Sequence, residues 1–402
     1  MNDTRLFDWH GCTILFMVRS LEMGGTQRQV GYLAPWLQQN SGARVMVLAL
    51  ERRGPLADLL EHHGIPWELH SGLLASQKIV KTLSLLKLLF RIRKIRPDIV
   101  LSFNDFPNKV CGAIWTWTGA KICVWNQRDE GLEVTGRFLE RRALRQVPLF
   151  IANSLQGVNF LTRRLQVPAE RIKVIHNGVR LTPPQQDRAF WRQQMKIAPA
   201  ALVAVMAANN YRYKDHDTLL RAWALVQEQA GGSEFHLVFA GKFADTSATL
   251  HRRCEKLNIA RRVHFLGHVD DITGLLKAAE IGVFSSQCEG MPNAVLEGMA
   301  AGLPLVATNI IGIREALGDD YPLLTPPGDA SAMARGLLGL MNNEGLRKRL
   351  GDRNQQRVQR FFSVEFMAQQ FADLIAPYVK SGIASSFISP LAGENEMARE
   401  KK

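Results

Sequence analysis

Short apolar runs alternate with longer amphipathic segments through most of the chain. In the first part of the sequence, the apolar runs lie at 14–18, 44–50, 98–103, 121–125, 149–152 and 173–175. Amphipathic segments such as 27–39 and 106–118 separate them. Short apolar strands that alternate with helices are typical of βαβ units, so the pattern predicts a parallel sheet covered by helices on both faces.

The alternation stops in 181–200, where three prolines lie among many polar residues. Such a segment favours a linker and the start of a new domain. The alternation then resumes, with apolar runs at 201–207, 235–241, 263–267, 281–286 and 303–308. The pattern therefore predicts two Rossmann-like, doubly wound α/β domains, 1–180 and 181–362, followed by a C-terminal helix.

Ser363 is a suitable N-cap for that helix, since apolar residues at helical spacing follow it. We assign 363–380 to the helix and expect it to pack back toward the N-terminal domain. From 381 to 402 the chain turns small and polar, which predicts a poorly ordered tail.

Composition excludes several classes of protein. The 402 residues are 46% hydrophobic and 22% charged, which is typical of globular domains. No uncharged apolar stretch reaches about 18 residues, and the run at 13–18 is too short for a signal peptide. The five cysteines are scattered without a CxxC pair, which argues against a disulfide framework or a zinc site and fits a reducing compartment.

The net charge of +13 favours anionic partners: sugar nucleotides, nucleic acid or an acidic membrane surface. No nucleic-acid-binding module or aromatic-basic motif accompanies it, so we do not expect a nucleic-acid partner.

The segment 78–96 holds seven basic residues and no acid. On a helical projection its apolar residues form two arcs, one of Ile79, Leu83, Leu86 and Phe90, the other of Leu85, Leu88, Leu89, Ile92 and Ile95. A surface helix needs only one apolar stripe, so the second arc favours peripheral contact with an anionic membrane. Burial on two sides and a subunit contact are the alternatives.

The segment 288–308 carries the most specific pattern. Glu289 follows an apolar run, which puts it at the carboxyl end of a parallel strand, where open α/β sheets bind ligands. Pro292 suits the first turn of a helix whose N-terminus favours a phosphate. Glu297 lies within that helix and could accept hydrogen bonds from ribose hydroxyls, as Glu289 could from sugar hydroxyls. An ordinary helix with one solvated and one dipole-favoured carboxylate is the alternative.

Glu289, Gly290, Pro292 and Glu297, with the turn 301–304, resemble the C-terminal signature of glycosyltransferase family four. The resemblance extends from about 15 to 378 and is most specific in 284–315. It implies the glycosyltransferase-B fold, two Rossmann-like domains facing across a cleft, and transfer that retains anomeric configuration. It also implies a UDP- or GDP-linked sugar as co-substrate, no other cofactor and no metal, with Met291 and Asn293 among the donor contacts.

Two further loops resemble parts of the family. Gly24 and Gly25 resemble the Gly-Gly loop after the first strand, where the missing Cβ lets backbone approach the donor or the acceptor; an ordinary tight turn is the alternative. Lys214 matches the lysine that holds the donor diphosphate, and Arg212 is the candidate for an arginine that the family places near Asn209. Two such cations stabilise the charge of the departing nucleotide, although both residues could instead be solvated loop charges. We take Lys214, Arg212 and Glu289 as the catalytic candidates.

Asp215 and Asp217 form an Asp-x-Asp pattern that superficially resembles a metal motif. We interpret one of them instead as the N-cap of the helix that follows. The paired carboxylates of a glycoside hydrolase must flank one bond. The proposed ribose role of Glu297 argues against that arrangement, so we assign neither Glu289 nor Glu297 as a nucleophile.

One segment departs from the family. Many members carry a His after the strand equivalent to 121–125, whereas 125–133 holds none. Asn126, Gln127 and Arg128 are candidate acceptor or sugar contacts, with Asp129 and Glu130 as further options.

The resemblance leads us to expect an enzyme that acts on a lipid-linked or growing cell-surface glycan, in the cytoplasm or peripherally on the inner face of the cytoplasmic membrane. A non-catalytic sugar-nucleotide-binding subunit is the alternative, against which the intact set of Lys214, Glu289 and Glu297 weighs.

Overall fold

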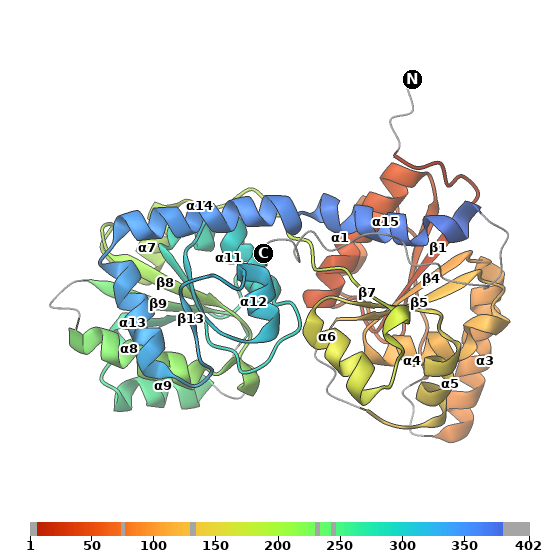
Figure 1. The fold of residues 1–402 in the computed structure, drawn as a ribbon, viewed down its shortest axis with the longest axis horizontal. Coiled ribbons are helices and arrows are strands. Elements are labelled where there is room, and N and C mark those ends of the chain that lie inside the picture. The colour runs from red at the N-terminus through yellow and green to blue at the C-terminus, as the bar shows by residue number, and fades with distance from the viewer. Residues whose placement is uncertain (1–5, 74–76, 129–133, 230–233, 243–246, 381–402) are drawn as a thin grey trace.

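The computed structural model contains two α/β domains side by side, joined along one side by the last two long helices (Figure 1). It describes residues 6–73, 77–128, 134–229, 234–242 and 247–380. The tail predicted at 381–402 lies outside the described residues.

The N-terminal sheet has seven parallel strands in the order β3-β2-β1-β4-β5-β6-β7. Its strands are β1 (Thr13–Val18), β2 (Arg44–Ala49), β3 (Trp67–Leu69), β4 (Ile99–Phe103), β5 (Ile122–Gln127), β6 (Leu149–Ala152) and β7 (Ile172–Val174). Its helices are α1 (Gly25–Ser41), α2 (Pro55–His62), α3 (Lys78–Ile95), α4 (Asp105–Ile114), α5 (Phe138–Gln146) and α6 (Leu155–Asn159). The strand order reverses beside β1, as in doubly wound folds.

The C-terminal sheet has six parallel strands in the order β10-β9-β8-β11-β12-β13. Its strands are β8 (Leu202–Ala207), β9 (Phe235–Ala240), β10 (Val263–Phe265), β11 (Ile281–Phe284), β12 (Leu305–Thr308) and β13 (Leu324–Thr325). Its helices are α7 (Arg188–Met195), α8 (His216–Gln229), α9 (Ser247–Lys256), α10 (Ile272–Ala278), α11 (Asn293–Ala300), α12 (Ile311–Leu317), α13 (Ala330–Met341) and α14 (Glu344–Phe361).

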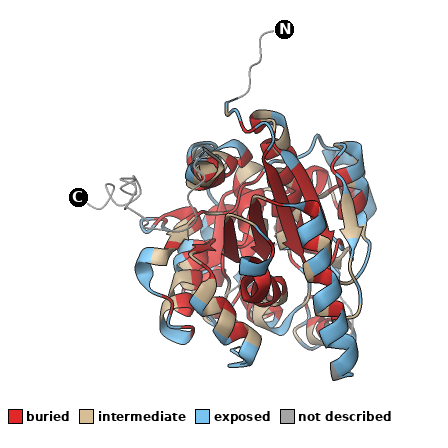
Figure 2. Ribbon diagram, turned by 90° about the vertical axis from the view of Figure 1, so that its right-hand side faces the viewer, coloured by how far each residue is buried: buried red, intermediate tan, exposed pale blue. Residues whose placement is uncertain are grey.

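Each sheet has a hydrophobic core on both faces. Alternate residues of one strand pack on opposite sides: Ile14 and Phe16 belong to one N-terminal core, and Leu15 and Met17 to the other. Figure 2 shows the buried sheet strands inside and exposed surface on the outer helices. Two-sided burial explains why these strands read as continuous apolar runs rather than as alternating ones.

The apolar runs of the sequence correspond to the observed strands within one or two residues at most ends. The sequence pattern missed β3 and β13. Both are edge strands, of three and two residues, and too short to form an apolar run.

Helix α15 (Val364–Lys380) returns to the N-terminal domain. Met367, Phe371 and Ile375 lie in the same core as α1 and the N-terminal sheet, each no more than 1% exposed. Burial of each such side chain contributes about 1.5–3 kcal/mol, so the helix is firmly held. The chain passes between the domains twice, near Val179 and near Phe362. Val179 donates its N–H to the carbonyl of Phe362 over 2.8 Å, so the two connections lie side by side.

Candidate functional site

The carboxyl ends of the two sheets face each other between the domains. Arg128 and Asn153 follow β5 and β6 of the N-terminal sheet, and the 212–214 and 286–293 segments follow β8 and β11. They meet at Gly290, where an added Cβ would lie 3.0 Å from Asn153 Oδ1 and 3.3 Å from the Arg128 carbonyl. Loops of both domains therefore converge at the strand edge where parallel α/β sheets bind ligands.

Lys214 and Glu289 form an ion pair within this region, with both side chains mostly buried. Ser286 Oγ also donates to Glu289 Oε1 over 3.0 Å. Lys214 Nζ lies 4.8 Å from the centre of the Phe284 ring. The two candidates, 75 residues apart, are thus neighbours because β8 and β11 are paired in the sheet.

Arg212 lies in the same short 3-10 turn, two residues before Lys214, and is exposed. Asn209, the position of the family's arginine, accepts a hydrogen bond from the Lys242 N–H over 2.9 Å. We did not single out Lys242 from the sequence. It lies two residues after the end of β9, the strand beside β8, and that adjacency was the available signal.

Asp215 and Asp217 are both engaged by protein groups. Asp215 accepts hydrogen bonds from the N–H and the hydroxyl of Thr218, and so caps α8. Asp217 forms ion pairs with Arg221 and Arg253. Of the two capping options, Asp215 is the one that the helix uses. Among the described residues there is no group of three or more His, Cys, Asp or Glu side chains suited to a metal ion.

Glu297 lies in α11 and points to the other domain. It forms an ion pair with Arg28 of α1, and its side chain is 9% exposed. Arg28, the fourth residue of α1, is a site residue that the sequence reading missed. A donor ribose that bonds to Glu297 must compete with this arginine.

A network of side-chain amides joins the start of α1 to the residues around the start of α11. Asn177 donates to the Met291 carbonyl over 2.9 Å and to Asn293 Oδ1 over 2.8 Å. Asn293 in turn donates to the Gly25 carbonyl over 3.2 Å. Gln29 exchanges two 2.9 Å hydrogen bonds with the backbone of Gly178, the residue after Asn177.

Several residues that we predicted to contact the nucleotide-sugar donor lie in or beside this network. The Met291 side chain is buried in the C-terminal core, and Pro292 is the N-cap of α11, one residue before the first turn to which we assigned it. Gly25 permits a close approach, since an added Cβ would lie 3.3 Å from the Asn293 amide nitrogen. Gly24 immediately precedes α1 as its N-cap.

Arg128 is a buried cation at the centre of the interface. One guanidinium nitrogen donates to Asn177 Oδ1 over 3.0 Å, and the group lies 5.2 Å from the Phe103 ring and 5.4 Å from the Phe371 ring. Among the residues that the structure describes, its Nε and Nη2 are buried without a hydrogen-bond partner. Burial lowers the pKa of Arg128 to about 9, which still leaves it charged at neutral pH. Such unused donors are suited to an anion or a hydroxyl from a substrate.

Asn126 and Gln127 lie inside the sheet as the last residues of β5, and both are buried. The Asn126 amide donates to the Ser102 carbonyl over 2.9 Å, and Gln127 Oε1 accepts from Trp125 over 3.0 Å. Of the three candidates in this run, Arg128 is therefore the one with unused donors. Asp129 and Glu130 lie outside the described residues.

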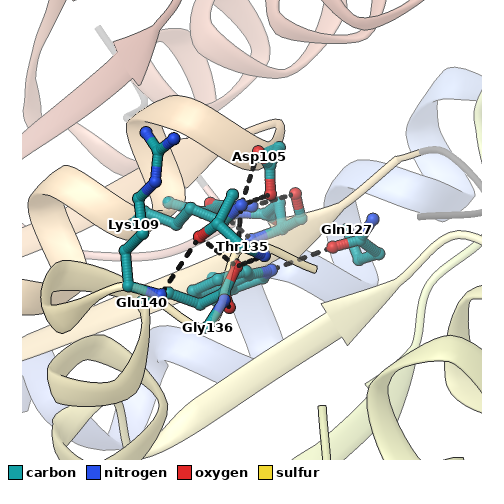
Figure 3. Close-up of polar contacts among 10 residues, drawn as sticks. Asp105, Lys109, Gln127, Thr135, Gly136 and Glu140 are labelled. Carbon is teal, nitrogen blue, oxygen red and sulfur yellow. Dashed lines mark hydrogen bonds and ion pairs between the residues drawn. The ribbon is translucent and has the colours of Figure 1, made fainter. Parts of the chain in front are cut away.

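A charge cluster with a buried Lys109 and Glu140 holds the backbone at Thr135 and Gly136 (Figure 3). Lys109 Nζ lies 2.8 Å from carboxylate oxygens of both Asp105 and Glu140. Glu140 also accepts from the N–H groups of Thr135 and Gly136. Burial acts to raise the pKa of Glu140, but the hydrogen bonds from Lys109, Thr135 and Gly136 outweigh it and hold that pKa below its usual range. The cluster holds the backbone of Thr135 and Gly136 in place.

The loop around Glu289 rests on a glycine of α12. A Cβ added to Gly312 would lie 1.4 Å from the carbonyl oxygen of Gly290, so only a glycine fits against this backbone.

We expect Gly312→Ala to displace the Glu289–Gly290 loop and to lower the melting temperature, with a loss of about 1–3 kcal/mol from overpacking. Gly339→Ala is the matched control, because that helical glycine of α13 has no atom within 4 Å of an added Cβ. Its variant should be neutral or slightly stabilised. The measurement is thermal unfolding of both variants. Equal melting temperatures would show that the loop moves to accommodate the methyl group without loss of stability.

Two doubly wound domains whose carboxyl strand edges face each other make up the glycosyltransferase-B class of fold. The family model for Glycosyltransferase Family 4 matches residues 23–182, and the one for Glycosyl transferases group 1 matches 200–343. One match falls in each domain, and the chain belongs to this family of glycosyltransferases.

Several curated proteins are similar in sequence. EpsD of Bacillus subtilis is 32% identical over 223 residues, which cover 54% of this chain and 57% of that protein. The lipopolysaccharide core biosynthesis glycosyltransferase LpsE of Rhizobium meliloti is 32% identical over 128 residues, covering 32% of this chain and 38% of that protein. The chain thus spans about half the length, or less, of the curated relatives it matches.

Solved structures share the fold over almost the whole chain. HepE of Anabaena, in complex with UDP-glucose, superposes with a TM-score of 0.77 at 22% identity, over 91% of this chain and 99% of that one. A glycosyltransferase from Rickettsia africae superposes with a TM-score of 0.80 at 18% identity, over 93% and 100%. At these identities the likeness establishes the fold.

Proposed function

We propose that this chain is a retaining glycosyltransferase that moves a sugar from a nucleotide-diphosphate donor to a lipid-linked or growing glycan in cell-surface polysaccharide synthesis. The observation that carries the proposal is the mostly buried Lys214–Glu289 pair, at a strand edge that faces the second domain. A cation and a carboxylate placed there are suited to the diphosphate and to the sugar hydroxyls of one donor.

In the proposed reaction, Lys214 neutralises the diphosphate as the bond between its oxygen and the sugar C1 breaks. The acceptor hydroxyl forms the new bond to C1 on the same face, and its proton passes to the leaving diphosphate oxygen. Glu297 accepts hydrogen bonds from the ribose, and Glu289 accepts them from sugar hydroxyls. Arg212, exposed beside Lys214, can add a second cation.

The named relatives support a choice of donor and pathway. Solved neighbours bind UDP and UDP-glucose, which makes a UDP-sugar the first donor to test. The name of LpsE refers to lipopolysaccharide core synthesis, which supports a cell-surface glycan as the product.

The acceptor is assigned to the N-terminal side of the interface. Arg128 supplies buried donors without partners among the described residues, and Gly25, at the start of α1, is exposed. No helix among the described residues is long and apolar enough to span a bilayer. We assign contact with a membrane-borne acceptor to the surface of 78–96, which combines basic residues with exposed apolar ones.

The proposal is tested by a donor-hydrolysis screen of the purified protein against UDP-, GDP- and ADP-sugars. We expect turnover of one donor, with release of the sugar as the anomer present in that donor, followed by nuclear magnetic resonance. Release of the opposite anomer would contradict retention. Donor binding without turnover, even with a glycan acceptor added, would favour the non-catalytic subunit.

We expect activity to persist in excess EDTA. Lys214 and Arg212 supply the positive charge that a metal ion supplies elsewhere, and Asp215 and Asp217 are engaged by Thr218 and by arginines. The measurement is the initial rate with and without chelator. If the chelator abolished activity and Mg²⁺ or Mn²⁺ restored it, Asp215 and Asp217 would again be candidates for a metal site.

A further inference from the structure

Helix α3 presents an apolar face that no other element of the described chain covers. Ile79, Leu83, Leu86 and Phe90 are between 47% and 75% exposed. The opposite arc packs into the N-terminal core, where Leu88 and its neighbours are buried. Burial on two sides therefore does not account for the first arc within this chain. The helix lies at the outer end of the N-terminal domain in Figure 1, on the side that Figure 2 presents to the viewer.

A basic hollow adjoins the end of this apolar arc. It has a volume of about 700 Å³, and its lining includes Arg93 and Lys94 from the end of α3, Arg96 from its C-cap, and Arg44 from the start of β2. Phe90 lines the hollow too and also belongs to the exposed arc. One aromatic side chain thus joins an apolar strip to a cationic cavity.

The cations of the hollow have no carboxylate partner in the part of the chain that the structure describes. All four are exposed, whereas Arg91, one turn away, pairs with Glu68. Asp98, an acid close in sequence, is engaged by Lys121 at 3.1 Å and by the Thr13 N–H at 2.8 Å. The positive charge of the hollow is therefore available to an anion.

The hollow belongs to a different region from the candidate active site. Thr13 and Arg44, in its lining, are the first residues of β1 and β2, at the amino ends of the strands. The donor site lies at the carboxyl ends. An anion in the hollow is accordingly not the donor diphosphate.

We propose that the hollow binds the phosphate headgroup of an anionic bilayer lipid while the apolar arc of α3 enters the acyl boundary. This inference rests on the membrane-borne acceptor of the proposed function. A cationic cavity alone would suit a free phosphate, but a free phosphate does not use the apolar strip that continues from Phe90. A helix with this division of apolar and basic residues lies in the plane of a membrane interface.

The test is flotation of the full chain with phosphatidylcholine vesicles that contain phosphatidylglycerol. The variant Arg93→Gln/Lys94→Gln/Arg96→Gln removes three cations without adding acids to the helix end. Each cation contributes about fivefold to binding, so we expect a loss of about a hundredfold. The matched control is Arg335→Gln/Lys348→Gln/Arg349→Gln, the same charge change on exposed residues of α13 and α14.

A second variant tests the apolar arc. Leu83→Ser/Phe90→Ser keeps every charge and should also lose binding to anionic vesicles. Failure of the wild type to float with anionic vesicles would overturn the proposal, as would equal flotation of the hollow variant or of the arc variant. Saturable binding of inorganic phosphate by calorimetry, without vesicle binding, would overturn it in favour of a free-phosphate site.

Donor hydrolysis separates this inference from the proposed function. The hollow and arc variants should hydrolyse a soluble nucleotide sugar at the wild-type rate, because the hollow lies at the opposite strand edge. Vesicle binding by a protein that turns over no donor would leave the membrane site standing and would remove the glycosyltransferase proposal.

Discussion

Lys214→Ala is expected to lower kcat by roughly 10²–10³-fold, the usual cost of removing one preorganised group that stabilises charge in a transition state. The ammonium acts mainly when the diphosphate departs, so KM should change much less than kcat. In the free protein the substitution leaves Glu289 without its ion-pair partner, which predicts a modest fall in melting temperature. Steady-state kinetics with the identified donor measures the effect.

Arg221→Ala is the control for this variant. Arg221 is a cation of the adjacent helix α8, but it pairs with Asp217 on the surface. Its removal should leave kcat unchanged. If Lys214→Ala keeps the wild-type kcat and only unfolds at a lower temperature, Lys214 holds the loop and does not act on the diphosphate.

Glu297→Ala is expected to weaken binding of the nucleoside diphosphate by roughly ten- to a hundredfold, the value of a charged hydrogen bond to a ribose hydroxyl. Calorimetry with the diphosphate of the identified donor measures it. The sharper comparison uses the 2′,3′-dideoxy nucleotide. The wild type should bind it more weakly than the parent nucleotide, whereas the variant should bind both alike.

Arg28→Ala separates ribose binding from the contact between domains. Both Glu297→Ala and Arg28→Ala remove the Arg28–Glu297 ion pair, but only the first removes the ribose acceptor. We expect Arg28→Ala to bind the nucleotide at least as tightly as the wild type, because the ribose then has no competitor. Equal losses in both variants would assign Glu297 to holding the two domains together.

Much of the fold follows from local pattern. The apolar runs and the polar break at 181–200 predicted two parallel-sheet domains, because a strand buried on both faces must be apolar throughout. The Lys214–Glu289 pair was also within reach of the sequence, since both residues follow apolar runs, and the carboxyl ends of parallel strands share one edge of a sheet. The short edge strands β3 and β13 were not, because they carry no periodic signal.

The interface between the domains is a matter of tertiary structure. Arg28 meets Glu297, and Asn177 meets Asn293, across sequence separations that no periodicity spans. The sequence marked Arg128 only as one polar residue in a run that lacks the family's histidine. Its burial between two aromatic rings depends on α15, which contributes Phe371 from the far end of the chain.

Within the single helix α3, some features follow from the sequence alone and others only from the tertiary structure. The sequence by itself determined that the helix has two apolar arcs and a row of cations, because side-chain direction along a helix follows from its period. Only the packing of the helix on the sheet decided that Leu88 and Ile92 face the core and that Leu83 and Phe90 remain exposed. It also decided that Arg91 is neutralised by Glu68 while Arg93 and Lys94 line a hollow. Helical periodicity sets the direction of each side chain around the helix. Which side of the helix is buried depends on the residues that pack against it, and these are distant in sequence.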